Sequence, residues 1–85
     1  AEEWLGGEEA FMVSTDMIPY SVAEYLNKNS ERHRTLRETG MSSEYGIEVN
    51  VMGQEFPAIE YKSGGVSFFI FPPEARRNVR QLISQ

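Results

Sequence analysis

The sequence contains no cysteine, and it has one histidine and one aspartate among its 85 residues. Without cysteine the chain forms neither a disulfide framework nor a thiolate zinc site, and one histidine excludes a histidine-rich metal site. A Ser–His–Asp arrangement would have to use His33 and Asp16, and no flanking motif supports it. The many glutamates could supply a carboxylate pair, but several have plain helix partners instead. We therefore expect no catalytic residue, no metal ligand and no cofactor.

Long apolar runs are also missing. No run exceeds four residues, whereas a membrane-spanning helix needs about 18 or more. The absence of cysteine fits a reducing, cytoplasm-like compartment. The net charge is −5, and a negative field disfavours non-specific binding to the phosphates of nucleic acids. These features predict a cytoplasmic protein without a membrane partner.

What is present suffices for one folded domain. Hydrophobic residues make up 40% of the chain and aromatic residues 12%, which is more than disordered segments contain. A chain of this size forms a single domain. Residues 1–10 read as a loose acidic arm, in which Trp4 and Leu5 could dock on the domain. We therefore place one α+β domain at residues 11–85.

The clearest local signal is a helix start in YSVAEY, residues 20–25. Ser21 and Glu24 have the spacing of a capping box, so the helix is predicted to begin at Val22. It should weaken at NKNS, residues 27–30, because asparagine and serine favour caps and turns over helix interiors.

A second helix is predicted for residues 31–39, capped by Ser30 and ended by Gly40. Leu36 is the only large apolar residue in this segment, which makes it a surface helix.

After Tyr45 the apolar residues alternate, which predicts strands. YGIEVNVMG points Ile47, Val49 and Val51 inward, and two further strands, EFPAIEYK and VSFFIF, follow after glycine turns. AFMVS, residues 10–14, suits an edge strand, and Pro73 is well placed for the first turn of a last helix. The predicted order is β-α-(α)-β-β-β-α, a three- or four-stranded antiparallel meander with helices packed on one face.

Positive charge is concentrated in two places within this acidic chain. Residues 32–43 have a net charge of +2 and residues 76–85 a net charge of +3. We call Arg32, Arg34 and Arg37 the first arginine cluster, and Arg76, Arg77 and Arg80 the second arginine cluster. The first cluster is either a solvated helix face or a recognition surface for an anionic partner.

Two stretches resemble a known DNA-binding family. Residues 20–41, with TLR opening the second helix, resemble the start of a MerR-type or excisionase-type winged helix. Residues 56–83 are similar to the wing and closing helix of excisionases, with FP, a Gly-Gly turn, an aromatic strand and an amphipathic helix. The resemblance implies DNA contacts from Arg32, Arg34, Thr35, Arg37 and Lys62.

The strand VSFFIF raises a separate question about its two faces. Val66, Phe68 and Ile70 share one face, and Ser67, Phe69 and Phe71 share the other. Helices on one side of the sheet cover only one of these faces. The side chains on the other face are either covered by the N-terminal segment, through Trp4, or left exposed as an apolar patch. Such a patch usually marks an interface.

These observations favour a non-catalytic binding or regulatory module that contacts a protein partner or a second copy of itself. A DNA-binding regulator of the winged-helix type is the alternative. The residues expected to contact a protein partner are Arg32, Arg34, Arg37, Phe69, Phe71, Arg76, Arg77 and Arg80.

Overall fold

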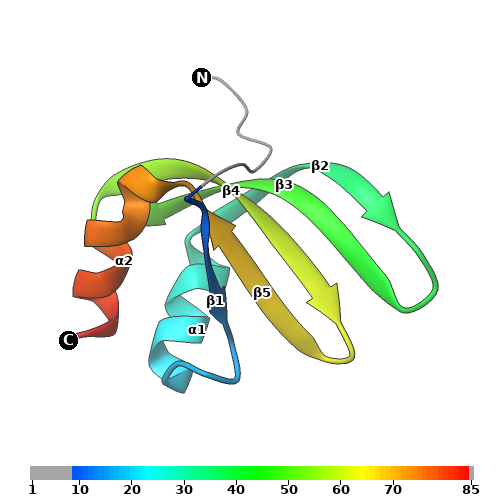
Figure 1. Ribbon diagram of the computed structural model, residues 1–85, viewed down its shortest axis with the longest axis horizontal. Helices are drawn as coiled ribbons and strands as arrows, with labels where there is room; N and C mark the ends of the chain where they lie inside the picture. Colours follow the sequence, from blue (N-terminus) through cyan, green and yellow to red (C-terminus); the bar gives the residue numbers. More distant parts are fainter. Residues whose placement is uncertain (1–8, 85) are drawn as a thin grey trace.

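The computed structural model describes residues 9–84 and shows a small α+β domain. Its five strands form one antiparallel sheet in the order β1-β5-β4-β3-β2. The two helices lie together at one end of the sheet, and the β2–β3 and β4–β5 hairpins extend away from them (Figure 1). The elements are β1 (Phe11–Ser14), α1 (Tyr20–Lys28), β2 (Ser30–Glu38), β3 (Ser42–Val51), β4 (Gln54–Ser63), β5 (Val66–Phe71), a 3₁₀ turn (Pro73–Ala75) and α2 (Arg76–Ile83).

The predicted α+β class is confirmed, together with the edge strand, the alternating strands and the last helix. The sheet has one more strand than the largest number predicted. The expected docking of Trp4 and Leu5 falls in residues 1–8, which lie outside the described residues.

The extra strand is β2, which replaces the helix predicted at residues 31–39. Ser30 does not cap a helix; its Oγ donates to the carbonyl of Asn27 at 3.1 Å. The Asn50 N–H then donates to the Asn29 carbonyl at 2.8 Å, which holds the end of α1 beside β3. A segment with Leu36 as its only large apolar residue has no stripe to bury as a helix, so pairing with β3 decides its structure.

Helix α1 is confirmed, but its predicted capping box is wrong. The helix begins at Tyr20, with Pro19 at the N-cap position and no side-chain capping bond. The Pro19 carbonyl accepts from the N–H groups of Val22 and Ala23 at 3.0 and 3.1 Å. The helix therefore starts two residues earlier than predicted, and the Glu24 carboxylate instead lies 3.7 Å from Nζ of Lys28.

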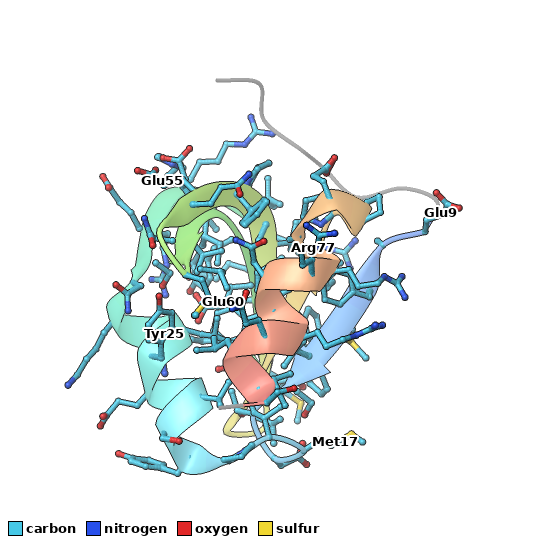
Figure 2. The ribbon with its side chains drawn as sticks, turned by 90° about the vertical axis from the view of Figure 1, so that its left-hand side faces the viewer. Glu9, Met17, Tyr25, Glu55, Glu60 and Arg77 are labelled. Atoms are coloured by element: carbon cyan, nitrogen blue, oxygen red, sulfur yellow. The ribbon has the colours of Figure 1, made fainter. Side chains whose placement is uncertain are left out.

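Both helices pack on the same face of the sheet, as predicted, and enclose the core (Figure 2). The Tyr25 hydroxyl of α1 accepts from the Met52 N–H at 3.0 Å, and the Asn78 amide of α2 donates to the Val51 carbonyl at 3.0 Å. The β3–β4 hairpin end thereby fixes both helices. The core side chains include Val13, Val22, Leu26, Ile47, Val49, Val51, Phe56, Ala58, Phe69, Phe71, Ala75, Val79 and Leu82.

Candidate functional site

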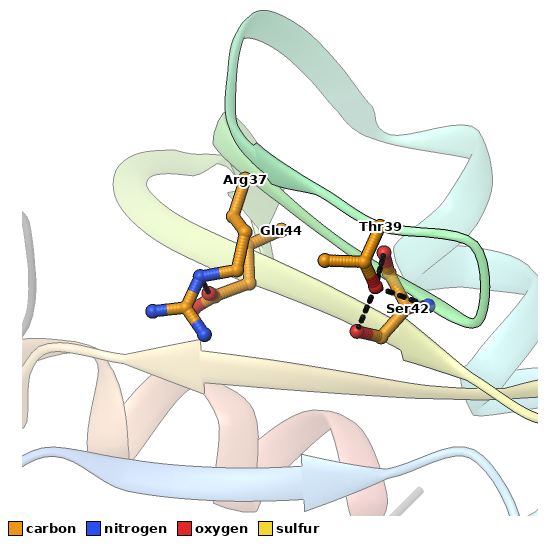
Figure 3. Close-up of polar contacts among 4 residues, drawn as sticks. All are labelled: Arg37, Thr39, Ser42 and Glu44. Carbon is orange, nitrogen blue, oxygen red and sulfur yellow. Dashed lines mark hydrogen bonds and ion pairs between the residues drawn. The ribbon is translucent and has the colours of Figure 1, made fainter.

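The first arginine cluster lies on β2, and two of its members face carboxylates. Nη2 of Arg32 is 3.4 Å from Oε1 of Glu60, and its guanidinium carbon is 3.6 Å from the centroid of the Tyr45 ring. Nε of Arg37 is 3.2 Å from Oε2 of Glu44 on β3 (Figure 3). Much of this positive charge is therefore compensated within the domain.

The strand also removes the recognition helix that the winged-helix resemblance requires, so that structural prediction is wrong. The cross-strand register places Arg32, Thr35 and Lys62 on the face that carries the helices, and it places Arg34 and Arg37 on the opposite, open face. Side chains that alternate in this way do not form one continuous surface on either face of the sheet. Arg34 also has an interaction partner within the chain.

Phe69 and Phe71 are not surface residues. Both are 0% exposed, because their face of β5 is the one that the helices cover. The prediction that they contact a partner from an uncovered face is therefore wrong for the folded domain. The predicted alternation of the β5 side chains between the two faces is confirmed. The open face instead carries the half-buried Phe68 and Ile70, with Met12 beside Ile70 on β1 and 60% exposed.

The second arginine cluster lies on α2 and differs from the first in its surroundings. Arg76, Arg77 and Arg80 are all exposed. Within residues 9–84 no carboxylate lies within ion-pair distance of their guanidinium groups. Figure 2 shows Arg77 on the outer side of α2. Among the described residues this helix therefore presents three arginines that form no ion pair, with Glu74 lining the same cavity beside them, on a chain whose net charge is negative.

An apolar groove runs between α2 and the edge strand β1, and we call it the β1–α2 groove. Its volume is about 250 Å³. Phe11 and Val13 form its strand side, since both point to the helix-covered face. The Arg76 guanidinium carbon lies 5.2 Å from the centroid of the Phe11 ring, which places a cation at the rim. The lining residues are Phe11, Val13, Arg76, Val79, Arg80, Ile83 and Ser84.

The strand beside this groove has an edge that is unpaired within residues 9–84, because among these residues β1 pairs only with β5. The Thr15 N–H donates to the Ser67 carbonyl at 2.9 Å. By the alternation of an antiparallel ladder, Phe11 and Val13 bond to β5, and the backbone groups of Met12 point to the free edge with the Ser14 N–H. The Ser14 carbonyl is engaged by the Met17 N–H at 3.0 Å.

The other edge of the sheet, β2, is protected against strand addition. Its register shifts twice, between Arg32 and Arg34 and between Thr35 and Arg37. Such irregularities twist an edge away from a flat partner, and charged side chains add to the protection. Strand β1, with the sequence FMVS, carries neither device. The two edges therefore differ, and among the described strands β1, although only four residues long, is the edge that is open to strand addition.

A cluster of three glutamates lies on the open face of the sheet near the start of β2. Glu31, Glu48 and Glu55 come from three neighbouring strands and line a cavity of about 190 Å³ with Asn29, Ser30 and Asn50. A hydrogen bond with Glu48 and the negative charges of Glu48 and Glu31 raise the pKa of Glu55. Nε2 of His33 lies 3.7 Å from Oε1 of Glu48. Among the described residues no acidic or histidine group is arranged to hold a metal ion.

Lys62 lies far from α2, in a cavity of about 330 Å³ between the β2–β3 and β4–β5 loops. Serine, threonine and glycine line most of this cavity. The Thr39 hydroxyl bonds to the Ser42 carbonyl at 3.2 Å and lies 3.0 Å from the Ser42 hydroxyl, which shapes the first loop (Figure 3). Lys62 is therefore separated from the second arginine cluster, which lies on α2.

Sequence reasoning found the arginines of α2 but not the apolar side of the groove. Phe11 and Val13 fall within the predicted edge strand, and Ile83 falls within the predicted last helix. What joins them is the placement of β1 at the sheet edge next to α2. That placement depends on which strand β1 pairs with, and no local pattern encodes it.

The chain matches no protein-family model, no curated protein and no solved structure in the comparisons. Neither of the helices in the described part of the chain is long and apolar enough to cross a membrane.

Proposed function

We propose that this domain is a non-catalytic protein-binding module and that its contact surface is the β1–α2 groove. The observation that carries the proposal is the apolar groove beside the unprotected edge of β1, bordered by Arg76 and Arg80. An edge strand next to an apolar groove supplies main-chain hydrogen bonds and a side-chain pocket together, which is how many domains bind an extended peptide.

The surrounding chemistry supports binding over catalysis. No acid or base stands at the groove: its polar members are Arg76, Arg80 and Ser84. Arginine and aromatic side chains are the types enriched at binding hot spots. Arg76 is held over Phe11 at the rim, so a partner would meet a cation and an apolar surface in one place.

The test is selection from a random peptide library displayed on phage, with the purified domain as bait. Ile83, which is 36% exposed at the groove, is changed to aspartate in a counter-bait. The matched control is Met41→Asp, because Met41 is 88% exposed in the distant β2–β3 loop. The proposal predicts peptides that bind the wild type and Met41→Asp but lose binding to Ile83→Asp. Peptides that bind all three baits equally, or no enrichment, would contradict it.

A further inference from the structure

The backbone, volume and charges of the β1–α2 groove indicate the chemistry of its partner, and this inference rests on the proposed function. We infer that the groove receives an extended acidic segment that adds to β1 as a further strand, with an apolar side chain in the groove and carboxylates beside it on Arg76 and Arg80.

The extended form follows from the backbone of β1. Met12 directs its N–H and its carbonyl to the free edge, and Ser14 adds its N–H. These groups match the main chain of a partner strand, whereas the backbone of a helix satisfies its own hydrogen bonds. The partner's side chains then alternate, and every second one faces the groove.

The size of the groove limits what it accepts. A volume of about 250 Å³ accommodates one or two apolar side chains rather than a helix face. Val79 is 2% exposed and Val13 is 7% exposed, so both form the buried floor of the groove. Ile83 is 36% exposed and forms an accessible side of the groove. The partner segment therefore needs a single apolar anchor at a groove-facing position.

The acidic character follows from the second arginine cluster. Among the described residues these three guanidinium groups have no carboxylate partner, unlike Arg32 and Arg37 on β2. Carboxylates are the side chains that arginine binds with two parallel hydrogen bonds. The acidic Asp16 lies at the other end of β1, where its Oδ1 accepts from the Ser14 hydroxyl. Since Glu9 precedes the Phe11 end of β1, the acids that flank the strand favour neither end, and the partner's carboxylates are expected beside Arg76 and Arg80 themselves.

A second copy of the domain fits this surface less well. Two β1 strands paired about a two-fold axis would bring both α2 helices to the same face of a continuous sheet. The α2 arginines of both copies would then lie on one face, and among the described residues the antiparallel pairing would bring only the Asp16 end of each β1 toward the Phe11 end of the other. Like charges placed in this way oppose association. Charge complementarity thus favours an acidic partner over self-pairing.

The experiment uses the peptides selected by the library, synthesised with a fluorescent label and titrated with the full domain by anisotropy. We expect aspartate or glutamate two residues from an apolar anchor. The double variant Arg76→Glu/Arg80→Glu should weaken binding by about tenfold, because two attractive charge pairs are replaced by two repulsive ones. A peptide with lysine in place of its acids should recover binding to that variant.

Arg77→Glu is the control, because it reverses one charge on the same helix, as each half of the double variant does, but does not line the groove. A scan of N-methylated peptides tests strand addition. Methylation at every second residue should abolish binding, and methylation at the intervening residues should not.

The outcomes separate this inference from the proposed function. Groove-dependent peptides that are neutral or basic, or that tolerate N-methylation throughout, would overturn the acidic strand and leave the protein-binding proposal standing. Peptides that bind the Ile83→Asp variant as tightly as the wild type would overturn both the inference and the proposed function. A dimer in sedimentation velocity that dissociates on Ile83→Asp would identify a second copy as the occupant and overturn the inference.

Discussion

Arg76, the first residue of α2, lies over the aromatic ring of Phe11 in the edge strand β1, with 5.2 Å between its guanidinium carbon and the ring centroid. The two residues are separated by most of the chain, and this contact joins α2 to β1. It places a cation from the second arginine cluster, which forms no ion pair among the described residues, at the rim of an apolar groove. The proposed binding surface is built on this relationship.

The first prediction concerns Phe69, which sequence patterns assigned to a binding surface. Its side chain is 0% exposed and packs with Phe71, with ring centroids 6.4 Å apart. Phe69→Ala should therefore lower the free energy of unfolding by about 3–5 kcal/mol, the range for large core aromatics. Urea denaturation followed by circular dichroism measures it. Phe68→Ala is the control, because Phe68 is half-buried on the open face, and it should lower the free energy of unfolding by clearly less. Equal losses would contradict this account of the core.

The second prediction concerns the pair of Arg32 and Glu60. Glu60 is 4% exposed, and the arginine that faces it at 3.4 Å has a side chain 48% exposed. Arg32→Ala leaves a buried carboxylate without its cation, and we expect a loss of about 1–3 kcal/mol.

A double-mutant cycle with Glu60→Gln distinguishes this pairing from lost packing against Tyr45. In the presence of Glu60→Gln, Arg32→Ala should lower the free energy of unfolding by less, because the uncharged amide of the glutamine needs no cation beside it. Additive losses would show that Arg32 acts only through its stacking on the ring.

The third prediction concerns pH and the acidic group on the open face. A hydrogen bond with Glu48, with the charges of Glu48 and Glu31, raises the pKa of Glu55 above its ordinary value of 4.5, and His33 acts in the opposite direction. A raised pKa means that the folded state binds this proton more readily than the unfolded state. The stabilising contribution is therefore complete below about 4.5 and is lost as the pH rises through the folded-state pKa.

A ¹³C-detected NMR titration of the side-chain carboxyl of Glu55 measures this pKa. We expect its midpoint to move down in Glu48→Gln, which removes the nearest negative charge. A midpoint that does not change in this variant would show that Glu48 is not the cause.

Much of the fold follows from local patterns. The alternation of Ile47, Val49 and Val51 predicts β3 and its buried face, and Pro73 marks the turn before α2. Both signals are local, because strand faces alternate strictly and proline suits the first turn of a helix.

Residues 31–39 show where local reasoning fails. Their composition allows a surface helix, but the long-range pairing of β2 with β3 outweighs a weak helical preference. Likewise the choice between the two faces of VSFFIF depends on which side the helices cover, and alternation cannot decide that. The arginines were identified from charge alone; whether each has a carboxylate partner depends on strand register.

The most direct test of the central claim is amide hydrogen exchange of the domain, measured residue by residue by NMR with and without a selected peptide. If a partner strand adds to β1, exchange of the Met12 and Ser14 amides should slow strongly on binding. The Val13 amide, already bonded to β5, should change much less. Protection along β2, or none on β1, would contradict the claim that this edge and its groove form the binding surface.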